Sequence, residues 1–266
     1  MDTRIGSTET DAAIQAQITK KLAEIEMKEN VTVLHAVESG SRAWGFESPD
    51  SDYDVRFIYV RRRADYLKLS EPRDVIEWQL DEVLDINGWD LRKALQHFHR
   101  GNATLFEWSN SPVVYGTTKL WQQIYAAAAP YFSAKAAVHH YYGTARNTWQ
   151  QYLQEPMVRY KKYFYALRPL LAAKYIQAHL CPPPVLFEDL MKMDMPEALR
   201  NQIQYALSLK VSMGETDTRP QIPAIQGFIG SEIQRQKAWL DGAQDDRKPE
   251  WEPLDAVFLR TLELLG

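Results

Sequence analysis

The order of residues 31–60 constrains the fold more than any other part of the chain. Residues 31–37 are largely apolar and rich in valine, which favours a β-strand. Gly40-Ser41 follows almost at once, and a flexible glycine before a hydroxyl suits a tight turn that opens a short helix. Residues 48–51 contain several turn formers, and a second apolar run starts directly after them. We therefore expect two neighbouring strands joined by a compact connection.

The second strand, expected over residues 52–60, carries a pair of acidic side chains. Because side chains alternate along a strand, Asp52, Asp54 and Arg56 are expected on one face and Val55 and Phe57 on the other. A solvated loop does not explain such an alternation. The pattern indicates a functional carboxylate pair.

Further elements follow on both sides of this segment. Helical periodicity covers residues 11–29, and a third strand is expected over residues 75–80. A fourth, short strand is expected to end at Leu84 or Asp85, with Asn87 capping the helix that follows. These elements predict an α+β fold.

The second half of the chain has a different pattern. From about residue 117 to residue 210 the strand signals fade and helical periodicity dominates. We therefore expect an α/β catalytic domain over residues 1–115 and a mainly helical domain over residues 116–266 that completes its cleft.

The composition is that of a globular protein: 266 residues, of which 45% are hydrophobic and 25% charged. No apolar run approaches the roughly 18 residues of a membrane span, and the first residues lack the pattern of a signal peptide, so we expect a cytoplasmic protein. The net charge of −4 argues against a surface that binds nucleic acid over its whole extent but allows a local basic groove. The single cysteine, Cys181, excludes an intramolecular disulfide and a multi-cysteine zinc site.

The turn and the aspartates together suit transfer of a nucleotide from a nucleoside triphosphate. Gly40 allows the backbone to approach phosphates, and Ser41 with neighbouring N–H groups can bind them at a helix N-terminus. Asp52 and Asp54, with a third carboxylate, offer the oxygen ligands that Mg²⁺ prefers. Two divalent ions can neutralise the triphosphate, activate an acceptor oxygen and stabilise the departing pyrophosphate.

A resemblance to a known superfamily rests on the segment GSRAWGFESPDSDYDVR, which is similar to the Gly-Ser…Asp-x-Asp signature of DNA-polymerase-β nucleotidyltransferases, with ten residues between Ser41 and Asp52. The segments LDINGWDLRKAL, GNATLFEW and YKKYFYALRPLLAAKY resemble the bacterial and phage branch that includes RNA-ligase-associated, RNA-repair nucleotidyltransferases. The resemblance implies a polymerase-β-like core, with a mixed twisted sheet and helices on one side. It also implies dependence on Mg²⁺ or Mn²⁺ and use of a nucleoside triphosphate, but it does not fix the acceptor.

The resemblance also assigns residues. Gly40 and Ser41 match the phosphate-binding turn, and Asp52 and Asp54 match the metal-binding, catalytic pair.

Two residues compete as the third catalytic carboxylate and metal ligand. Asp85 is expected at a strand end before a capped helix and matches the branch pattern that precedes its Leu-Arg-Lys helix. Glu77 is expected inside a strand with apolar flanks, where the superfamily often places this ligand. We predict Asp85, with Glu77 as its competitor.

Five further side chains are candidates for binding the nucleotide. Arg42 either binds phosphate or caps the local turn. Arg56 either positions the triphosphate or forms an ion pair that lowers the pKa of the aspartates. Lys161, Tyr165 and Arg168 share a helix face by their spacing and either reach the triphosphate across a cleft or form an ordinary polar face.

The leading hypothesis is an Mg²⁺-dependent nucleotidyltransferase that moves a nucleoside monophosphate from an NTP to a hydroxyl acceptor, with release of pyrophosphate. RNA is the preferred acceptor by resemblance. One alternative is the same chemistry on a protein or a small molecule, for example AMPylation, which the acidic net charge keeps open. The other is a non-catalytic regulator that binds a nucleotide.

Overall fold

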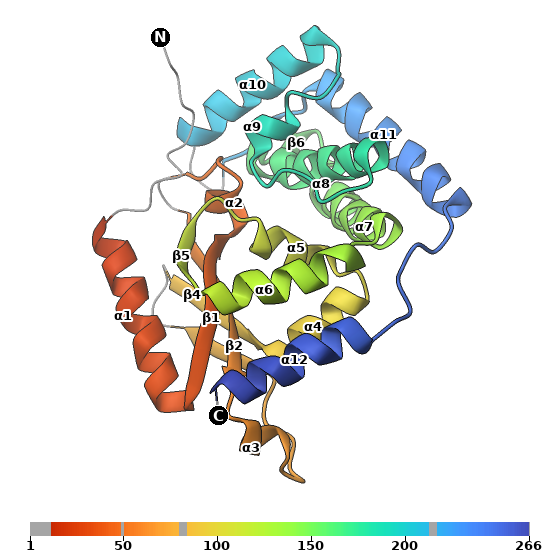
Figure 1. Cartoon of the computed structure of the whole chain (residues 1–266). Helices are drawn as coiled ribbons and strands as arrows, with labels where there is room; N and C mark the ends of the chain where they lie inside the picture. The colour runs from red at the N-terminus through yellow and green to blue at the C-terminus, as the bar shows by residue number, and fades with distance from the viewer. Residues whose placement is uncertain (1–11, 49–50, 80–83, 213–216, 266) are drawn as a thin grey trace. The chain divides into compact units, whose positions relative to one another are not determined.

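Residues 12–48, 51–79, 84–212 and 217–265 are described by the computed structural model in Figure 1. In chain order the elements are α1 (Ala12–Glu29), β1 (Val31–Ser39), α2 (Gly40–Ala43), β2 (Tyr53–Arg61), α3 (Arg63–Tyr66), β3 (Val75–Gln79), β4 (Leu84–Asp90), α4 (Leu91–His99), α5 (Ala103–Ser109), β5 (Val114–Thr117), α6 (Lys119–Ala128), η1 (Ala129–Tyr131), α7 (Ala134–Tyr152), β6 (Met157–Val158), α8 (Tyr160–His179), α9 (Phe187–Leu190), α10 (Glu197–Ser212), β7 (Arg219–Pro220), α11 (Pro223–Gly242) and α12 (Glu252–Leu265).

Five strands form one mixed sheet in the order β3-β4-β2-β1-β5. The central strand β2 is antiparallel to β1 and parallel to β4, while β3 and β5 pair antiparallel at the edges. In this register Ser39 lies opposite Asp54, and Asp54 lies opposite Asp85. Asp54, Asp85 and the Gly40 turn that follows Ser39 therefore lie at the same end of the three central strands.

Helices α4, α5, α6 and α12 cover one face of the sheet (Figure 1). Each helix contributes its apolar stripe to a core built on the strand residues that point to this face, as expected for amphipathic helices. This core includes Leu34, Ile58, Phe98, Trp121 and Leu262. The predicted helical layer on one side of the sheet is thus present, and the fold is α+β as predicted.

The opposite face is covered by α1, which the prediction of helices on one side did not include. Ile18, Leu22 and Ile25 of α1 are buried against Val55 and Phe57 of β2. Alternation along β2 sends these residues to the α1 side while Asp54 and Arg56 point the other way. The predicted faces of this strand are therefore correct.

Two predicted boundaries were wrong. β2 begins at Tyr53, so Asp52 lies just before the strand. β4 does not end at Leu84 or Asp85 but continues to Asp90, because it pairs with strands on both sides. Asn87 is consequently a strand residue, and the N-cap of α4 is Asp90, whose side chain accepts a hydrogen bond from the Arg92 N–H.

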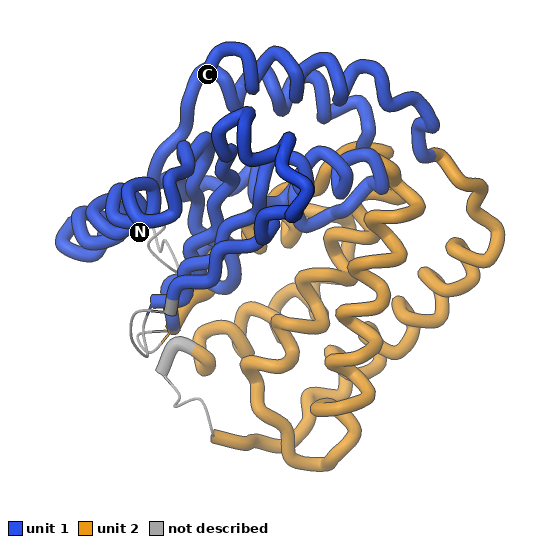
Figure 2. The backbone as a smooth tube through the Cα atoms, turned by 90° about the horizontal axis from the view of Figure 1, so that it is seen from below, with its two compact units in different colours: residues 1–43, 52–132, 247–266 blue, residues 44–51, 133–246 orange. Residues whose placement is uncertain are grey.

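The chain divides into two compact units, coloured separately in Figure 2. Unit 1 consists of residues 1–43, 52–132 and 247–266, and unit 2 of residues 44–51 and 133–246. Unit 1 thus takes in α6 and α12 as well as the sheet, because both helices pack into the core beside α4. The division of roles between residues 1–115 and residues 116–266 stays a prediction.

Unit 2 is mainly helical. Its helices α7, α8 and α11 contact one another, and β6 and β7 form a short ribbon. Phe46 packs here: its ring lies 5.6 Å from that of Phe164 and 5.5 Å from that of Phe187. In the described parts of both units, helices that combine the length and the apolar character needed to cross a membrane are absent.

Candidate active site

The turn after β1 lies directly against Asp54. Gly40 has a φ of +64°, a backbone conformation that residues with a side chain rarely adopt. A Cβ atom at this position would overlap with Asp54 Oδ2 and lie 3.1 Å from Asp54 Cγ. Glycine is therefore required here for two reasons, its φ and the approach of the carboxylate. Ser41, next in the chain, is buried.

Arg56 joins Asp54 to Asp85. Its Nη2 atom donates to Asp54 Oδ1 at 2.8 Å and to Asp85 Oδ2 at 2.7 Å, and its Nη1 atom donates to the Asp85 carbonyl at 3.1 Å. The side chains of Asp54 and Asp85 are 33% and 55% exposed, whereas that of Arg56 is 17% exposed. Two carboxylates from adjacent parallel strands thus converge on one cationic nitrogen at a surface open to solvent.

Asp52 and Arg42 lie at the entrance to β2. The Asp52 side chain is exposed, and its carbonyl accepts a hydrogen bond of 3.1 Å from Arg42 Nε. The Arg42 guanidinium also stacks over the Tyr53 ring, 3.7 Å from its centroid. Arg42 therefore holds the start of β2 in place. This role is close to the predicted alternative in which Arg42 caps the local turn.

The two candidates for the third carboxylate lie at different distances from Asp54. Asp85 is the direct register partner of Asp54 on β4. Glu77 lies on β3, one strand further away, exposed and opposite Asn87. Two strand spacings amount to about 9–10 Å, so Glu77 lies about twice as far across the sheet from β2 as Asp85 does. The geometry favours Asp85.

Lys161, Tyr165 and Arg168 all lie on α8 in unit 2. Lys161 Nζ is 5.9 Å from the centroid of the Tyr165 ring, which fits their predicted common face. Arg168 is only 2% exposed, with its guanidinium over the rings of Trp44 and Tyr141 at 4.7 Å and 5.6 Å. Arg168 thus has a packing role within unit 2, and a role of this helix at the triphosphate stays a prediction.

Glu38 is a site residue that the sequence reasoning missed. It is 1% exposed, and its Oε1 atom accepts the Asp54 backbone N–H at 2.7 Å. Its second oxygen accepts the hydroxyl of Tyr115. Burial raises the pKa of Glu38 to about 7, although the bonds from Tyr115 and Asp54 act in the opposite direction. The available signal was an acidic residue at the end of an otherwise apolar strand, just before the Gly-Ser turn.

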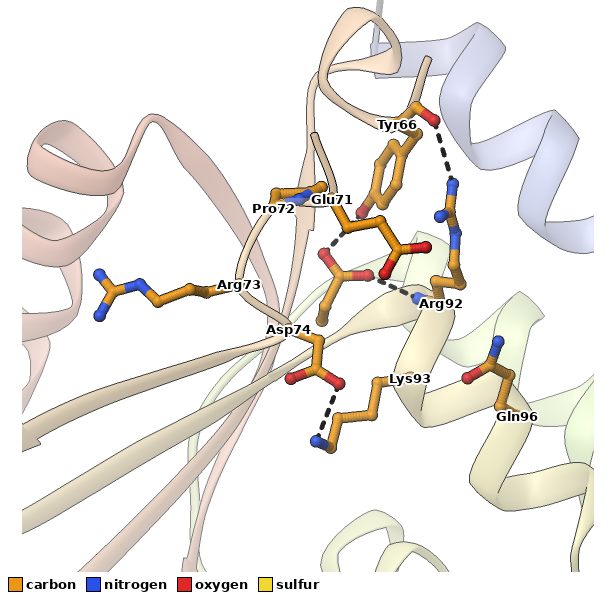
Figure 3. A pocket seen from close by; sticks show the side chains of 9 residues that line it. Tyr66, Glu71, Pro72, Arg73, Asp74, Arg92, Lys93 and Gln96 are labelled. Carbon is orange, nitrogen blue, oxygen red and sulfur yellow. Dashed lines mark hydrogen bonds and ion pairs between the residues drawn. The ribbon is translucent and has the colours of Figure 1, made fainter. Parts of the chain in front are cut away.

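A separate cavity of about 450 Å³ lies at the opposite end of β4, between the segment that leads into β3 and the first turn of α4 (Figure 3). Asp90 accepts hydrogen bonds here from the Tyr66 hydroxyl at 2.9 Å and from the Arg92 N–H at 2.8 Å. Lys93 points to Asp74, with 3.0 Å between their charged atoms. These groups satisfy one another and fix the start of α4. None of the predicted site residues lines this cavity.

Asp54 and Asp85, beside the Gly40 turn, offer part of a ligand set for a divalent cation. Asp54 and Asp85 already share a positive charge in the form of Arg56 Nη2, and carboxylate oxygens are the ligands of Mg²⁺. Asp52 is exposed one residue before β2. Within the described residues, three or more acidic, histidine or cysteine side chains do not form a cluster that could hold a metal ion. The structure thus brings two of the three predicted ligands together.

Comparison with known proteins identifies the family of this chain. The model of a family described as "RNA repair pathway DNA polymerase beta family" (RlaP) matches residues 14–260. The chain is 39% identical over 254 residues to the uncharacterized protein YcgL of Bacillus subtilis (strain 168), covering 94% of this chain and 97% of that protein. A crystal structure of a nucleotidyltransferase-like protein from Exiguobacterium sibiricum 255-15 has 10% sequence identity, covers 93% of this chain and 80% of that chain, and gives a TM-score of 0.25, too low to support an inference. Because the family model and the Bacillus subtilis relative both span nearly the whole chain, the protein belongs to the RNA repair pathway DNA polymerase beta family, as the resemblance of the Gly-Ser…Asp-x-Asp signature and of the three further segments indicated.

Proposed function

We propose that the protein transfers a nucleoside monophosphate from an NTP to a hydroxyl group at an RNA end, with release of pyrophosphate. The observation that carries this proposal is the pairing of Asp54 with Asp85 on adjacent strands, with the Gly40 turn against Asp54. Family membership supports both nucleotidyl transfer and an RNA repair context.

The donor triphosphate would bind at the turn after β1. Gly40 leaves its backbone open to phosphate oxygens because it has no side chain, and Ser41 adds N–H and hydroxyl donors. Arg56 lies beside the carboxylates and supplies positive charge where the phosphates would collect. Arg168 supports α8 from within unit 2, and the contribution of Lys161 and Tyr165 of this helix to triphosphate binding stays a prediction from the sequence.

Asp52, Asp54 and Asp85 would hold the metal, Mg²⁺ or Mn²⁺. When bound, this ion neutralises charge on the triphosphate and increases the acidity of the acceptor hydroxyl. The Arg56 guanidinium, paired with both Asp54 and Asp85, compensates their negative charge before the ion binds.

The reaction requires one bond to form and one to break. The acceptor oxygen bonds to the α-phosphorus, and the bond from that phosphorus to the oxygen bridging to the β-phosphate breaks. The hydroxyl proton passes to one of the three aspartates, and pyrophosphate leaves with the bridging oxygen. The chain thus contributes orientation of the triphosphate, a proton acceptor and compensation of charge.

The test is incubation of the full chain with each α-labelled NTP, Mg²⁺ and a panel of RNA 3′ ends. We expect label on RNA and release of pyrophosphate. The variant Asp52→Asn, Asp54→Asn should abolish both, whereas Asp65→Asn, which changes an acidic residue of α3 in the same unit, should not.

The other outcomes identify other functions. Label on a protein or a small molecule, with RNA unlabelled, would replace the RNA acceptor and keep the donor chemistry. Binding of NTP without release of pyrophosphate would indicate a nucleotide-binding regulator. Labelling that survives loss of both aspartates would rule out a mechanism that depends on this carboxylate pair.

A further inference from the structure

The side chains of Glu38 and Asp54 lie on opposite faces of the sheet. In the antiparallel pairing of β1 with β2, Glu38 is opposite Val55, whose side chain is buried on the α1 face of the sheet. Asp54 points to the other face. The Glu38 carboxylate therefore reaches the backbone of Asp54 from the face that the proposed substrates do not approach.

The contact replaces a bond of the sheet. At this point β1 leaves the ladder to form the Gly40 turn, and the Asp54 N–H donates to Glu38 Oε1 at 2.7 Å. A buried N–H needs an acceptor, and here a side chain supplies it. The start of β2 is thus held to β1 by Glu38 at the residue that carries the carboxylate of the site.

Glu38 is itself fixed by three bonds to the segment around β5. Tyr115 donates its hydroxyl to the second carboxylate oxygen. Ser111 Oγ donates to the Glu38 carbonyl at 2.7 Å, and the Glu38 N–H donates to the Val113 carbonyl at 3.0 Å. Glu38 therefore connects Asp54 to an edge strand that bears none of the predicted site residues.

We propose that Glu38, anchored by Tyr115, is the positioning residue for Asp54: it holds the Asp54 backbone so that the carboxylate stays against Gly40 and toward Asp85. The inference rests on the proposed function in that it takes Asp54 as a metal ligand. Groups that orient a metal ligand typically change metal affinity by about 10- to 100-fold when they are removed.

The useful substitutions differ in which of the two contacts, to the Asp54 N–H or to the Tyr115 hydroxyl, they keep. Glu38→Gln keeps an oxygen that can accept the Asp54 N–H, and its NH₂ group can face the Tyr115 oxygen instead of accepting from it. Glu38→Ala removes both contacts. Tyr115→Phe leaves the bond to Asp54 and removes the anchor.

The first measurement is hydrogen exchange of the Asp54 amide in the full chain, which needs neither metal nor substrate. We expect exchange in Glu38→Ala to be at least about tenfold faster than in the unmodified protein. Exchange in Glu38→Gln should be close to that of the unmodified protein. Tyr115→Phe should speed exchange by a smaller factor. The second measurement is Mn²⁺ affinity, which should fall by about 10- to 100-fold in Glu38→Ala and be restored in Glu38→Gln.

The control is Thr118→Ala. It removes a hydrogen bond to the carbonyl of Leu34, which lies on β1 four residues before Glu38, and it also removes the cap of α6. Its Mn²⁺ affinity should remain unchanged even if its stability falls. Equal losses in Thr118→Ala and Glu38→Ala would overturn the inference, as would a Gln variant as impaired as the Ala variant.

If Glu38→Ala does not fold, Tyr115→Phe carries the test, and unchanged exchange of the Asp54 amide in that variant would overturn the inference. The two proposals can fail separately. A chain that binds no Mn²⁺ and transfers no nucleotide would refute the proposed function, while amide exchange would still show whether Glu38 holds Asp54.

Discussion

The carboxylate of Asp54 lies so close to the Cα atom of Gly40 that a methyl group on residue 40 would overlap with it. Residue 40 also has a φ of +64°. We expect Gly40→Ala to displace Asp54, to cost about 1–3 kcal/mol of backbone strain, and to abolish nucleotide transfer. Thermal unfolding and the labelling assay measure the two effects.

Gly116 on β5 provides the matched substitution, because a Cβ atom there would meet nothing within 4 Å. Gly116→Ala should keep activity and nearly all stability. If the two alanine variants behave alike, the close approach of Asp54 has no functional meaning.

Asp85 and Glu77 make different predictions for the third carboxylate. Asp85 pairs with Asp54, whereas Glu77 lies a further strand away. We expect Asp85→Asn to lower kcat by about a hundredfold, because it removes the negative charge of a ligand and leaves Arg56 Nη2 with one carboxylate partner. Glu77→Gln should leave kcat nearly unchanged. The reverse order of effects would assign the ligand to Glu77.

The site could be predicted from sequence where it depends on local pattern. A Gly-Ser turn, an apolar strand and alternating side chains are features of neighbouring residues, so the turn at Gly40, the short helix that it opens and the faces of β2 were predicted correctly. The extent of β4 was not predicted, because a strand with partners on both sides continues past residues that would otherwise begin a helix.

What the sequence did not reveal depends on contacts between distant residues. The partners Glu38 and Tyr115 are 77 residues apart, and α12 joins the sheet of unit 1 from the far end of the chain. The role of Arg56 was left between two alternatives that only the placement of Asp85 on the neighbouring strand can separate. The helix α1 reads as amphipathic in sequence, but which face of the sheet it covers is a property of the whole unit.

Arg56 compensates the two carboxylates when no metal is bound. We expect Arg56→Gln to lower metal-free stability by about 1 kcal/mol, since Asp54 and Asp85 are partly exposed and solvent screens their repulsion. Mg²⁺ should then raise the Tm of the variant more than that of the unmodified protein, because a bound ion relieves a larger repulsion. Thermal unfolding with and without Mg²⁺ measures the difference.

Arg235→Gln is the control, since it removes the ion pair with Glu232 on α11, and unit 2, to which α11 belongs, contains none of the three predicted carboxylate ligands. Its response to Mg²⁺ should equal that of the unmodified protein. An Arg56→Gln variant whose Tm responds to Mg²⁺ no more strongly would show that the guanidinium and the ion do not act at the same carboxylates.

Two buried groups of β1 should give opposite slopes of stability against pH. Burial lowers the pKa of His35 from 6.5 to about 4, so the unfolded chain binds the extra proton between these values and stability falls as the pH falls, by about 3 kcal/mol in all. Burial raises the pKa of Glu38 from 4.5 to about 7, so the folded chain binds the extra proton and stability falls by a similar amount as the pH rises. The two slopes oppose each other between pH 4.5 and 6.5, and stability should be nearly flat there.

Glu38→Gln should expose the His35 slope, with stability rising from pH 4 to 6.5, and His35→Gln should expose the Glu38 slope, with stability falling from pH 4.5 to 7. Denaturant unfolding at each pH tests this, and parallel pH profiles for the two variants would contradict the assignment of either group.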